Sequence, residues 1–243
     1  MNTLGQPWML SFSPYARISQ VPVSQVVDAI HYLFFRWGFV PTFRADNGAP
    51  FGDPSRQSIS PLNLYLIGLG IRVKLNPPRS PIKNAKVERN QGTTSRWACP
   101  SLCSNYVQLQ QKLDEVMVDQ RQNYPTKTCQ GKTRAEKYPA LLNNPQRFHP
   151  NDFQVQRVYQ FLSKGSWKRK VSAQGVVSIL GSDLQVGFKH RATTVTATFD
   201  PITVQWIFKN DRGDLLKSCK PPNLDEKTIL SFSSKCQRTS GNL

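Results

Sequence analysis

Two carboxylates in this chain could hold a divalent metal ion. Asp46 follows a short apolar stretch and precedes the turn residues Asn47-Gly48, so we expect it at the end of a strand. Glu88 falls in the first turns of a predicted helix. Carboxylate oxygens are hard anionic ligands suited to Mg²⁺ or Mn²⁺, and such ions support phosphoryl transfer by activating a nucleophile and stabilising a leaving oxygen. Asp46 and Glu88 are therefore the candidate catalytic and metal-binding residues.

Taken alone, this acid pair also fits a structural interpretation. Asp-Asn-Gly is a common turn sequence, and a glutamate in the first turn of a helix interacts favourably with the helix dipole. From the residues by themselves, both interpretations stay open.

Basic side chains near Glu88 would suit a phosphate backbone. The candidate DNA-binding residues of this region are Arg79, Lys83, Asn84, Lys86 and Arg89. A second candidate group stands at the start of a strand-rich region and consists of Lys168, Arg169 and Lys170, with Lys189, His190 and Arg191 as a possible extension.

The composition points to a polyanionic partner. The 243 residues include 32 Lys+Arg against 15 Asp+Glu, a formal charge of +17 with a pI near 10.0. Residues 1–100 carry +7, residues 101–153 carry +2 and residues 154–243 carry +8. Two basic blocks around a nearly neutral connector favour nucleic acid over a membrane surface, although basic residues can also serve solubility alone.

Other classes are excluded by the same composition. A hydrophobic fraction of 38% is enough for a core. The chain contains no run of 18 or more apolar residues, which is the length needed to span a bilayer, so we expect no membrane partner. The N-terminus lacks the features of a secretory signal. Five cysteines without a C-x-x-C pair predict no zinc site and favour a reduced, cytoplasmic compartment.

The elements that must position the two acids are predicted to form an α/β layer. Ser60-Pro61 is a good start for a helix, and Asn84 can cap another. The pattern predicts a short strand within residues 12–21, a helix over 23–37, a strand over 41–46, a helix over 62–69, a strand with a positive face over 71–75 and a helix over 84–98.

The second half of the chain changes character. A helix is predicted over residues 104–122, and Thr133 to Glu136 fit a capping box. Residues 145–152 read as a linker. Beyond them, short strands of period two separated by turn signals predict a small barrel or sandwich of about 60 residues, and we expect the last twenty residues to be polar and frayed.

Three motifs together resemble the integrase catalytic core of bacterial transposases and retroviral-type integrases, the acid-triad (DDE) family. They are Arg44–Phe51, Leu69–Ile71 and Pro81–Arg89, and the resemblance covers about residues 12–98. It implies that Asp46 and Glu88 match the second and third acids, that Asn84 begins the third motif, and that Lys86 and Arg89 lie close to DNA. The implied fold is α/β, a ribonuclease-H-like core followed by a helical connector and a small all-β barrel.

The first acid of the triad is not assigned in this sequence. Asp28 is the only acid before Asp46, and it stands inside a predicted helix rather than at a strand end. We therefore expect a truncated copy that begins inside the catalytic domain, lacks the first strand and the upstream helix-turn-helix, and is catalytically impaired. The expected domains are a partial catalytic core (1–98), a connector (99–153), a DNA-binding β-barrel (154–220) and a polar tail (221–243).

The function expected from this resemblance is DNA transposition by Mg²⁺- or Mn²⁺-dependent phosphoryl transfer. Its partners would be element ends and target DNA, together with further copies or a full-length transposase, in a bacterial cytoplasm and on the nucleoid when bound. Two alternatives remain. One is a non-catalytic DNA-binding fragment that occupies element ends or modulates full-length transposase. The other is a general nucleic-acid-binding module in which both acids are structural.

Overall fold

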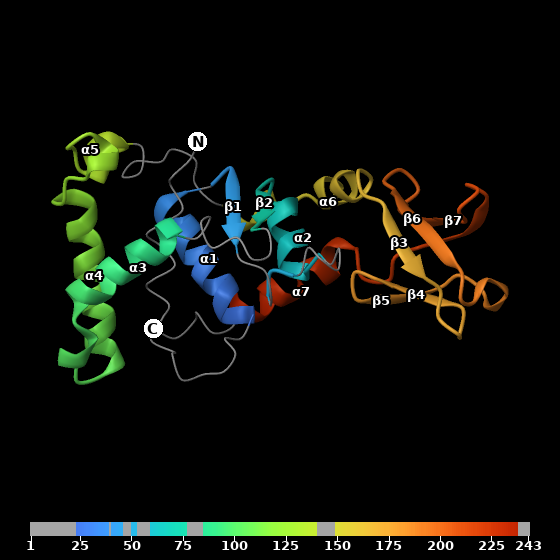
Figure 1. Ribbon diagram of the computed structural model, residues 1–243, viewed down its shortest axis with the longest axis horizontal. Coiled ribbons are helices and arrows are strands. Elements are labelled where there is room, and N and C mark those ends of the chain that lie inside the picture. The colour runs from blue at the N-terminus through green and yellow to red at the C-terminus, as the bar shows by residue number, and fades with distance from the viewer. Residues whose placement is uncertain are drawn as a thin grey trace. The chain divides into compact units, whose positions relative to one another are not determined.

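The computed structural model describes residues 23–38, 40–45, 50–52, 59–76, 85–139 and 149–237. Over these residues the protein is mixed α/β, with helices and small antiparallel sheets (Figure 1). The chain divides into two compact units, one of residues 1–44 and 79–149 and the other of residues 45–78 and 150–243. These units interleave along the sequence, whereas the predicted domains follow one another, and the domain boundaries stay predictions.

Helices dominate the described part of the first unit. Val23–Trp37 and Ala85–Ala98 form helices over the spans that their sequence patterns predict. The predicted strand within residues 12–21 lies outside the described residues. The elements are α1 (Val23–Trp37), α3 (Ala85–Ala98), η4 (Pro100–Leu102), α4 (Tyr106–Gln122), η5 (Lys127–Cys129) and α5 (Arg134–Lys137).

The core between α3 and α4 combines apolar packing with one buried polar contact. Ala98 packs with Leu113 and Val116, and half-buried apolar side chains cover the cluster. Beside it, the buried Gln120 side chain donates a hydrogen bond of 3.1 Å to the Thr94 hydroxyl. The two helices are therefore held by a contact with defined geometry as well as by apolar area.

The predicted capping box at α5 is confirmed. The Thr133 hydroxyl accepts a hydrogen bond from the backbone N–H of Glu136, and the Glu136 carboxylate accepts one of 2.7 Å from the backbone N–H of Thr133. These bonds from Thr133 hold the pKa of Glu136 below its usual value. The backbone N–H groups of Thr133 and Glu136, which have no acceptor within the helix, are therefore both hydrogen-bonded to side chains, and this stabilises a helix of only four residues.

The second unit is built around a short helix that is buried on nearly all sides. Helix α2 (Pro61–Gly68) starts as predicted, with the Ser60 side chain accepting a hydrogen bond from the N–H of Asn63. Tyr65 of α2 stacks on Phe153 with ring centroids 6.0 Å apart, and a Cβ at Gly68 would overlap that same Phe153 ring. This close approach brings α2 against α6 (Val155–Leu162), which follows η7 (Pro150–Asp152).

The two short strands nearest to the acid motifs also follow the sequence prediction. Strand β1 (Thr42–Ala45), whose last residue opens the second unit, pairs with β2 (Arg72–Leu75). Arg72 and Lys74 of β2 are exposed, as predicted for a strand with one positive face.

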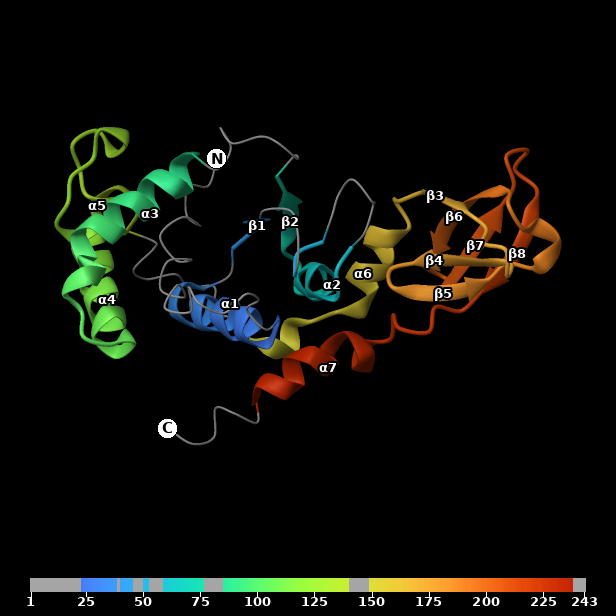
Figure 2. The ribbon, with the colours of Figure 1, turned by 60° about the horizontal axis from the view of Figure 1, so that its bottom comes forward.

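The strand-rich region forms an open sheet and a separate hairpin. The sheet has the order β3-β6-β7-β8 and is antiparallel throughout, and β4 pairs only with β5 (Figure 2). Since β3 and β8 occupy opposite edges and are not paired, the described residues form no closed barrel, and the predicted barrel is corrected to this arrangement. The strands are β3 (Trp167–Lys170), β4 (Val176–Ile179), β5 (Ser182–Gln185), β6 (Thr194–Asp200), β7 (Gln205–Lys209) and β8 (Leu215–Cys219), with η8 (Phe188–His190) before β6.

The two helices that flank the strand-rich region in the sequence were not expected. Helix α6 precedes the strands, and α7 (Glu226–Gln237) corrects the predicted frayed tail over the described residues, whereas residues 238–243 lie outside them. The tail is anchored because Leu224 and Ile229 are buried and the Tyr159 hydroxyl donates a hydrogen bond of 3.1 Å to the carbonyl oxygen of Leu224. Burial raises the pKa of the Tyr159 hydroxyl, and the nearby Asp225 and Glu226 act in the same direction.

The described helices were also searched for membrane-spanning segments. None of them combines the length and the apolar character that crossing a bilayer requires.

Candidate functional site

The strand that leads to Asp46 is present. Strand β1 ends at Ala45, one residue before Asp46, as the sequence predicts. The Ala45 carbonyl oxygen accepts a hydrogen bond of 3.0 Å from the N–H of Asn76, which follows β2. Asp46 itself lies outside the described residues, so its distance to Glu88 is not part of the structure.

Glu88 lies in the first turn of α3 and is exposed. The packed side of this helix carries Thr94 and Ala98, which are buried against α4. Residues spaced by three and four share a helix face, so Glu88 and Arg96 lie on one stripe on the opposite side. Arg89, also exposed, borders this stripe and adds a second guanidinium to it.

The middle of the stripe is open. Gly92 lies between Glu88 and Arg96 and has no side chain, and a Cβ built there would meet no atom within 4 Å. The Arg96 Nε donates a hydrogen bond of 3.2 Å to the Gly92 carbonyl oxygen. The surface of α3 is therefore free of side-chain atoms at Gly92, between the positions of Glu88 and Arg96.

The remaining predicted residues of this region are only partly described. Arg79, Lys83 and Asn84 lie outside the described residues. Helix α3 begins at Ala85, directly after the predicted cap residue Asn84. Lys86 belongs to α3, but its side chain is not described. Of the candidates near the third motif, the structure thus describes only the side chains of Glu88 and Arg89, which are consecutive and exposed on α3.

Strand β3 separates its three basic residues onto two faces. Lys168 and Lys170 are exposed, whereas Arg169 is half-buried with the opposite orientation. The Arg169 guanidinium donates hydrogen bonds to the carbonyl oxygens of Ser178 (3.3 Å) and Lys168 (2.9 Å). Arg169 therefore links β3 to the β4–β5 hairpin, and Lys168 and Lys170 are the side chains of the triplet that face solvent.

The loop at η8 carries the possible basic extension. The Arg191 guanidinium lies 4.6 Å from the centroid of the exposed Phe188 ring, which is a cation–π contact. Lys189 is exposed in the same turn. The loop joins the sheet where the N–H of Val171 donates to the carbonyl oxygen of Thr193, at the end of β3.

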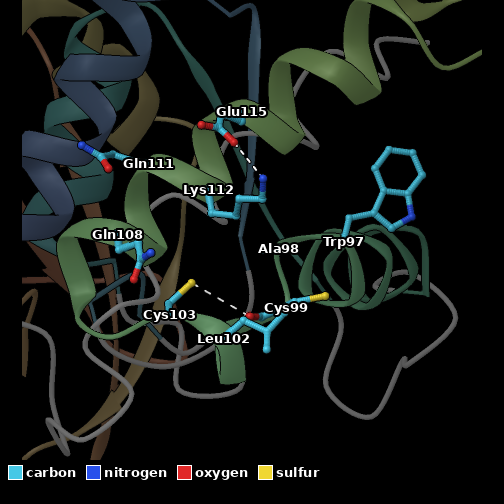
Figure 3. Close-up of a pocket in the computed structure, with 9 residues that line it drawn as sticks. All are labelled: Trp97, Ala98, Cys99, Leu102, Cys103, Gln108, Gln111, Lys112 and Glu115. Atoms are coloured by element: carbon cyan, nitrogen blue, oxygen red, sulfur yellow. Dashed lines mark hydrogen bonds and ion pairs between the residues drawn. The ribbon is translucent and has the colours of Figure 1, made fainter.

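The sequence analysis missed a pocket in the first unit. A pocket of about 440 Å³ lies at the C-terminal end of α3, between η4 and α4 (Figure 3). On its α4 side, Lys112 Nζ and Glu115 Oε2 form an ion pair of 2.9 Å, and the hydrogen bond to Glu115 raises the pKa of Lys112. Nothing in the sequence distinguishes this pair from any surface pair spaced by three residues on a helix.

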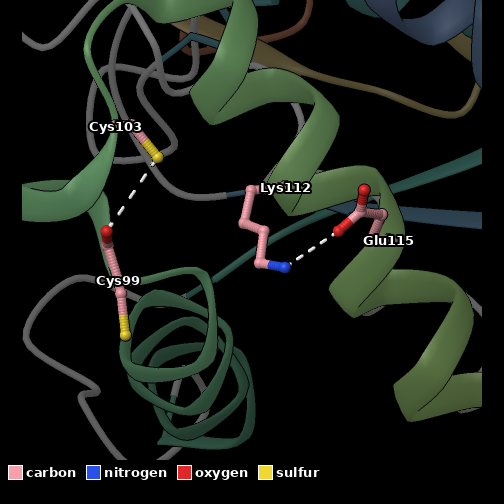
Figure 4. A network of polar contacts seen from close by, with 4 residues as sticks. All are labelled: Cys99, Cys103, Lys112 and Glu115. Carbon is pink, nitrogen blue, oxygen red and sulfur yellow. Dashed lines mark hydrogen bonds and ion pairs between the residues drawn. The ribbon is translucent and has the colours of Figure 1, made fainter.

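Two thiols also border this pocket without forming a site. The Cys103 thiol donates to the Cys99 carbonyl oxygen over 3.9 Å, and the Cys99 thiol points away from Cys103 toward the Arg96 carbonyl oxygen (Figure 4). Each polar group drawn in this network is engaged with a neighbour on the protein.

Metal-binding clusters are absent from the part of the chain that the structure describes. No group of three His, Cys, Asp or Glu side chains there could hold a metal ion. Glu88 is one exposed carboxylate, and the other predicted ligand, Asp46, is outside the described residues.

No protein-family model matches the chain, and no curated protein matches it significantly. The resemblance to the integrase core therefore depends on the three sequence motifs that include Asp46, Gly70 and Glu88.

Proposed function

We propose that this chain is a transposase- or integrase-type protein that acts on DNA by metal-dependent phosphoryl transfer, with a ribonuclease-H-like core. Asp46 and Glu88 are the carboxylates of its site. The observation that supports the proposal is the exposed stripe of α3, which carries the Glu88 carboxylate and Arg96 and is bordered by Arg89. This combination supplies a ligand for a cation and groups that bind phosphate oxygens.

The order of elements supports the same assignment. β1 ends directly before Asp46, and α2, β2 and α3 then follow in the order expected from the sequence. Glu88 lies in the first turn of α3 and is exposed, which a site acting on a macromolecule requires.

The donor set fits a hard divalent cation. Mg²⁺ binds through one or two carboxylates and keeps several water ligands, so Asp46 and Glu88 would hold one cation weakly, and without an assigned first acid the two-metal arrangement lacks its bridging ligand and activity is impaired. When bound, such an ion activates a water or hydroxyl nucleophile and neutralises charge at the phosphate. The part of this chain is to hold the cation, while Arg89 and Arg96 attract and orient the DNA backbone.

A DNA-binding role without catalysis is the second candidate. It is favoured by Lys168 and Lys170, which are exposed on β3 in a region that carries a net charge of +8. Such a protein would occupy element ends or modulate full-length transposase without cleaving DNA.

Strand cleavage with the purified full chain separates these candidates. Because the first acid is not assigned, we expect at most slow nicking of supercoiled plasmid and of a labelled duplex, and only when Mg²⁺ or Mn²⁺ is present. Asp46→Asn and Glu88→Gln should each lower the rate by about 100-fold or more. Glu115→Gln, which changes an exposed glutamate of α4 in the same way, should leave the rate unchanged.

Two results would overturn the proposal. Cleavage that persists in the Glu88→Gln protein would remove this carboxylate from the site. DNA binding without any metal-dependent cleavage would favour the non-catalytic role.

A further inference from the structure

The second unit holds the chain on both sides of the segment of residues 46–49, which we call the Asp46 segment. Directly before it, Ala45 is 4% exposed, and its carbonyl oxygen accepts a hydrogen bond of 3.0 Å from the N–H of Asn76. Shortly after it, the carbonyl oxygen of Phe51 accepts a hydrogen bond of 2.5 Å from a side chain of α2. Since consecutive Cα atoms are about 3.8 Å apart, two fixed ends limit where the short segment between them can lie.

The side chain of α2 that bonds Phe51 is Asn63. The backbone of Asn63 is fixed by the start of the helix, where its N–H donates a hydrogen bond of 3.2 Å to the Ser60 hydroxyl oxygen. Its side chain is 4% exposed, and its sequence neighbours Leu62 and Leu64 are buried as well. A buried amide on a fixed backbone has little freedom to turn, so its donor group stays directed at the Phe51 carbonyl oxygen.

Helix α2 is itself anchored, so it can serve as a fixed support for this contact. Tyr65 stacks on Phe153, and the carbonyl oxygen of Gly68 at the C-terminal end accepts a hydrogen bond from the N–H of Gln154. These contacts come from the segment that leads into α6, far later in the chain. Asn63 therefore connects a packed helix with the far side of the Asp46 segment.

Packing alone does not favour an asparagine at this position. The Asn63 Oδ1 is buried and has no hydrogen-bond partner among the residues that the structure describes. A buried acceptor without a partner lowers stability, and an apolar side chain of similar size, such as leucine, would avoid that cost. The contribution of the amide group is thus its hydrogen bond to Phe51.

We propose that Asn63 is a positioning residue for Asp46. Asn63 fixes the far side of the Asp46 segment, while the bond between Asn76 and Ala45 fixes the near side, and together they hold the Asp46 carboxylate ready to bind a divalent cation. Asn63 itself contacts neither the cation nor DNA. This role rests on the proposed function, because it takes Asp46 as a metal ligand.

Hydrogen exchange of the full chain without metal tests the hold itself. Asn63→Leu keeps the size of the side chain and removes the donor. We expect amide exchange in a peptide spanning residues 44–52 to become about three- to tenfold faster, the range for one hydrogen bond, while exchange in β6 and β7 stays the same. Unchanged exchange over residues 44–52 in a folded Asn63→Leu protein would overturn the proposal.

Mn²⁺ binding tests the consequence for the metal site. The concentration of free Mn²⁺ is read from its electron paramagnetic resonance signal, without DNA. We expect Asn63→Leu to raise the Kd for Mn²⁺ about tenfold, the lower end of the range for residues that support a metal ligand. Asp46→Asn, which removes the ligand, should raise it at least as much. An unchanged Kd for Asn63→Leu, beside a raised one for Asp46→Asn, would contradict a positioning role.

Cleavage at different Mn²⁺ concentrations separates positioning from loss of the ligand. At low Mn²⁺, Asn63→Leu should cleave duplex DNA about tenfold more slowly, with an unchanged KM for the duplex. Raising the Mn²⁺ concentration should restore most of this rate, because only the affinity for the metal is weakened. It should not restore the rate of Asp46→Asn. A rate of Asn63→Leu that no Mn²⁺ concentration improves would count against the proposal.

A destabilised variant of the same unit is the control. Val177 of β4 is 1% exposed, and Val177→Ala removes buried methyl groups without touching α2. It should match the parent to within about twofold in exchange over residues 44–52 and in the Kd for Mn²⁺. Equal effects of Val177→Ala and Asn63→Leu would show general destabilisation and overturn the proposal. If circular dichroism shows that Asn63→Leu does not fold, Asn63→Ala takes its place in every measurement.

Failure here is distinguishable from failure of the proposed function. If Asn63→Leu speeds exchange over residues 44–52 while no Mn²⁺ binding depends on Asp46, the hold on the segment is supported and the metal-dependent function falls. If Mn²⁺ binding depends on Asp46 while Asn63→Leu changes neither exchange nor affinity, only the positioning role of Asn63 falls.

Discussion

The Arg157 guanidinium donates a hydrogen bond of 3.0 Å to the carbonyl oxygen of Gly68, 89 residues earlier in the chain. The same Nη1 donates to the carbonyl oxygen of Asp152, also over 3.0 Å. Gly68 accepts a further hydrogen bond from the N–H of Gln154. These contacts satisfy the C-terminal end of α2 with groups from the segment that leads into α6, and so join the two parts of the second unit.

Removing this contact should loosen the second unit. We expect Arg157→Ala to lower the free energy of unfolding by about 1–2 kcal/mol, because hydrogen bonds from a charged donor are lost while Gly68 keeps its bond from Gln154. Urea denaturation followed by tryptophan fluorescence measures the change. Arg212→Ala, in an exposed turn, should stay within about 0.5 kcal/mol of the parent. An equal effect of both substitutions would contradict a specific role of Arg157.

Two glycine-to-alanine substitutions should have opposite effects. At Gly68 the added Cβ overlaps the buried Phe153 ring, so we expect a loss of about 1–3 kcal/mol. At Gly92, inside α3, the Cβ meets nothing, so alanine should stabilise the helix by about 0.5–1 kcal/mol. Thermal melting of both variants checks the contrast, and a stabilising Gly68→Ala would show that α2 and α6 are not packed this closely.

The buried hydrogen bond between Gln120 and Thr94 can be measured by a double-mutant cycle. Thr94→Val alone leaves the Gln120 amide without this acceptor and should cost about 1–3 kcal/mol. Adding Gln120→Leu should recover part of that loss, because both partners are then apolar. Strictly additive effects in urea denaturation would mean that the two side chains do not interact.

The capping box at α5 should make stability depend on pH in the acidic range. The pKa of Glu136 is lowered by its hydrogen bonds to Thr133, so the unfolded chain binds a proton more readily than the folded one. The stabilisation is therefore complete above pH 4.5, the ordinary value, and is lost as the pH falls through the lower folded value.

Glu136→Gln tests this linkage because glutamine does not ionise. The melting temperature of the variant should lie below that of the parent at pH 7, and the difference should shrink at pH 3. Asp183→Asn, on the exposed side of β5, serves as the control. A difference that is the same at both pH values would exclude ionisation of Glu136 as its source.

Local patterns were sufficient for elements with distinct start signals. Ser60-Pro61 marked α2, and Thr133 with Glu136 marked α5, because a cap is made by residues adjacent in the sequence. The apolar periodicity of α1 gave its bounds for the same reason.

Features that depend on distant residues could not be predicted in this way. Helix α6 directly precedes the segment whose alternating pattern predicts strands, and it is stabilised by contacts with α2, which lies far earlier in the chain. The sheet stays open because β3 and β8 do not pair, which no local pattern reveals.

The candidate functional residues also fall into those that local motifs predict and those whose orientation depends on strand pairing. Residue types and motifs could point to Glu88 and Arg89 without knowledge of the structure. The orientation of Arg169 follows from strand register, and register is set by the pairing of β3 with β6, where Arg169 lies opposite Val195, 26 residues later in the chain.

The interleaved second unit has a consequence for biosynthesis. Helix α2 is buried on nearly all sides, yet its partner α6 leaves the ribosome only after some ninety further residues have been made. During that interval the leucine-rich α2 segment has no native partner from α6 and offers a binding segment for chaperones. We therefore expect a nascent chain halted near residue 140 to be held by chaperones, and one halted after α7 to be released.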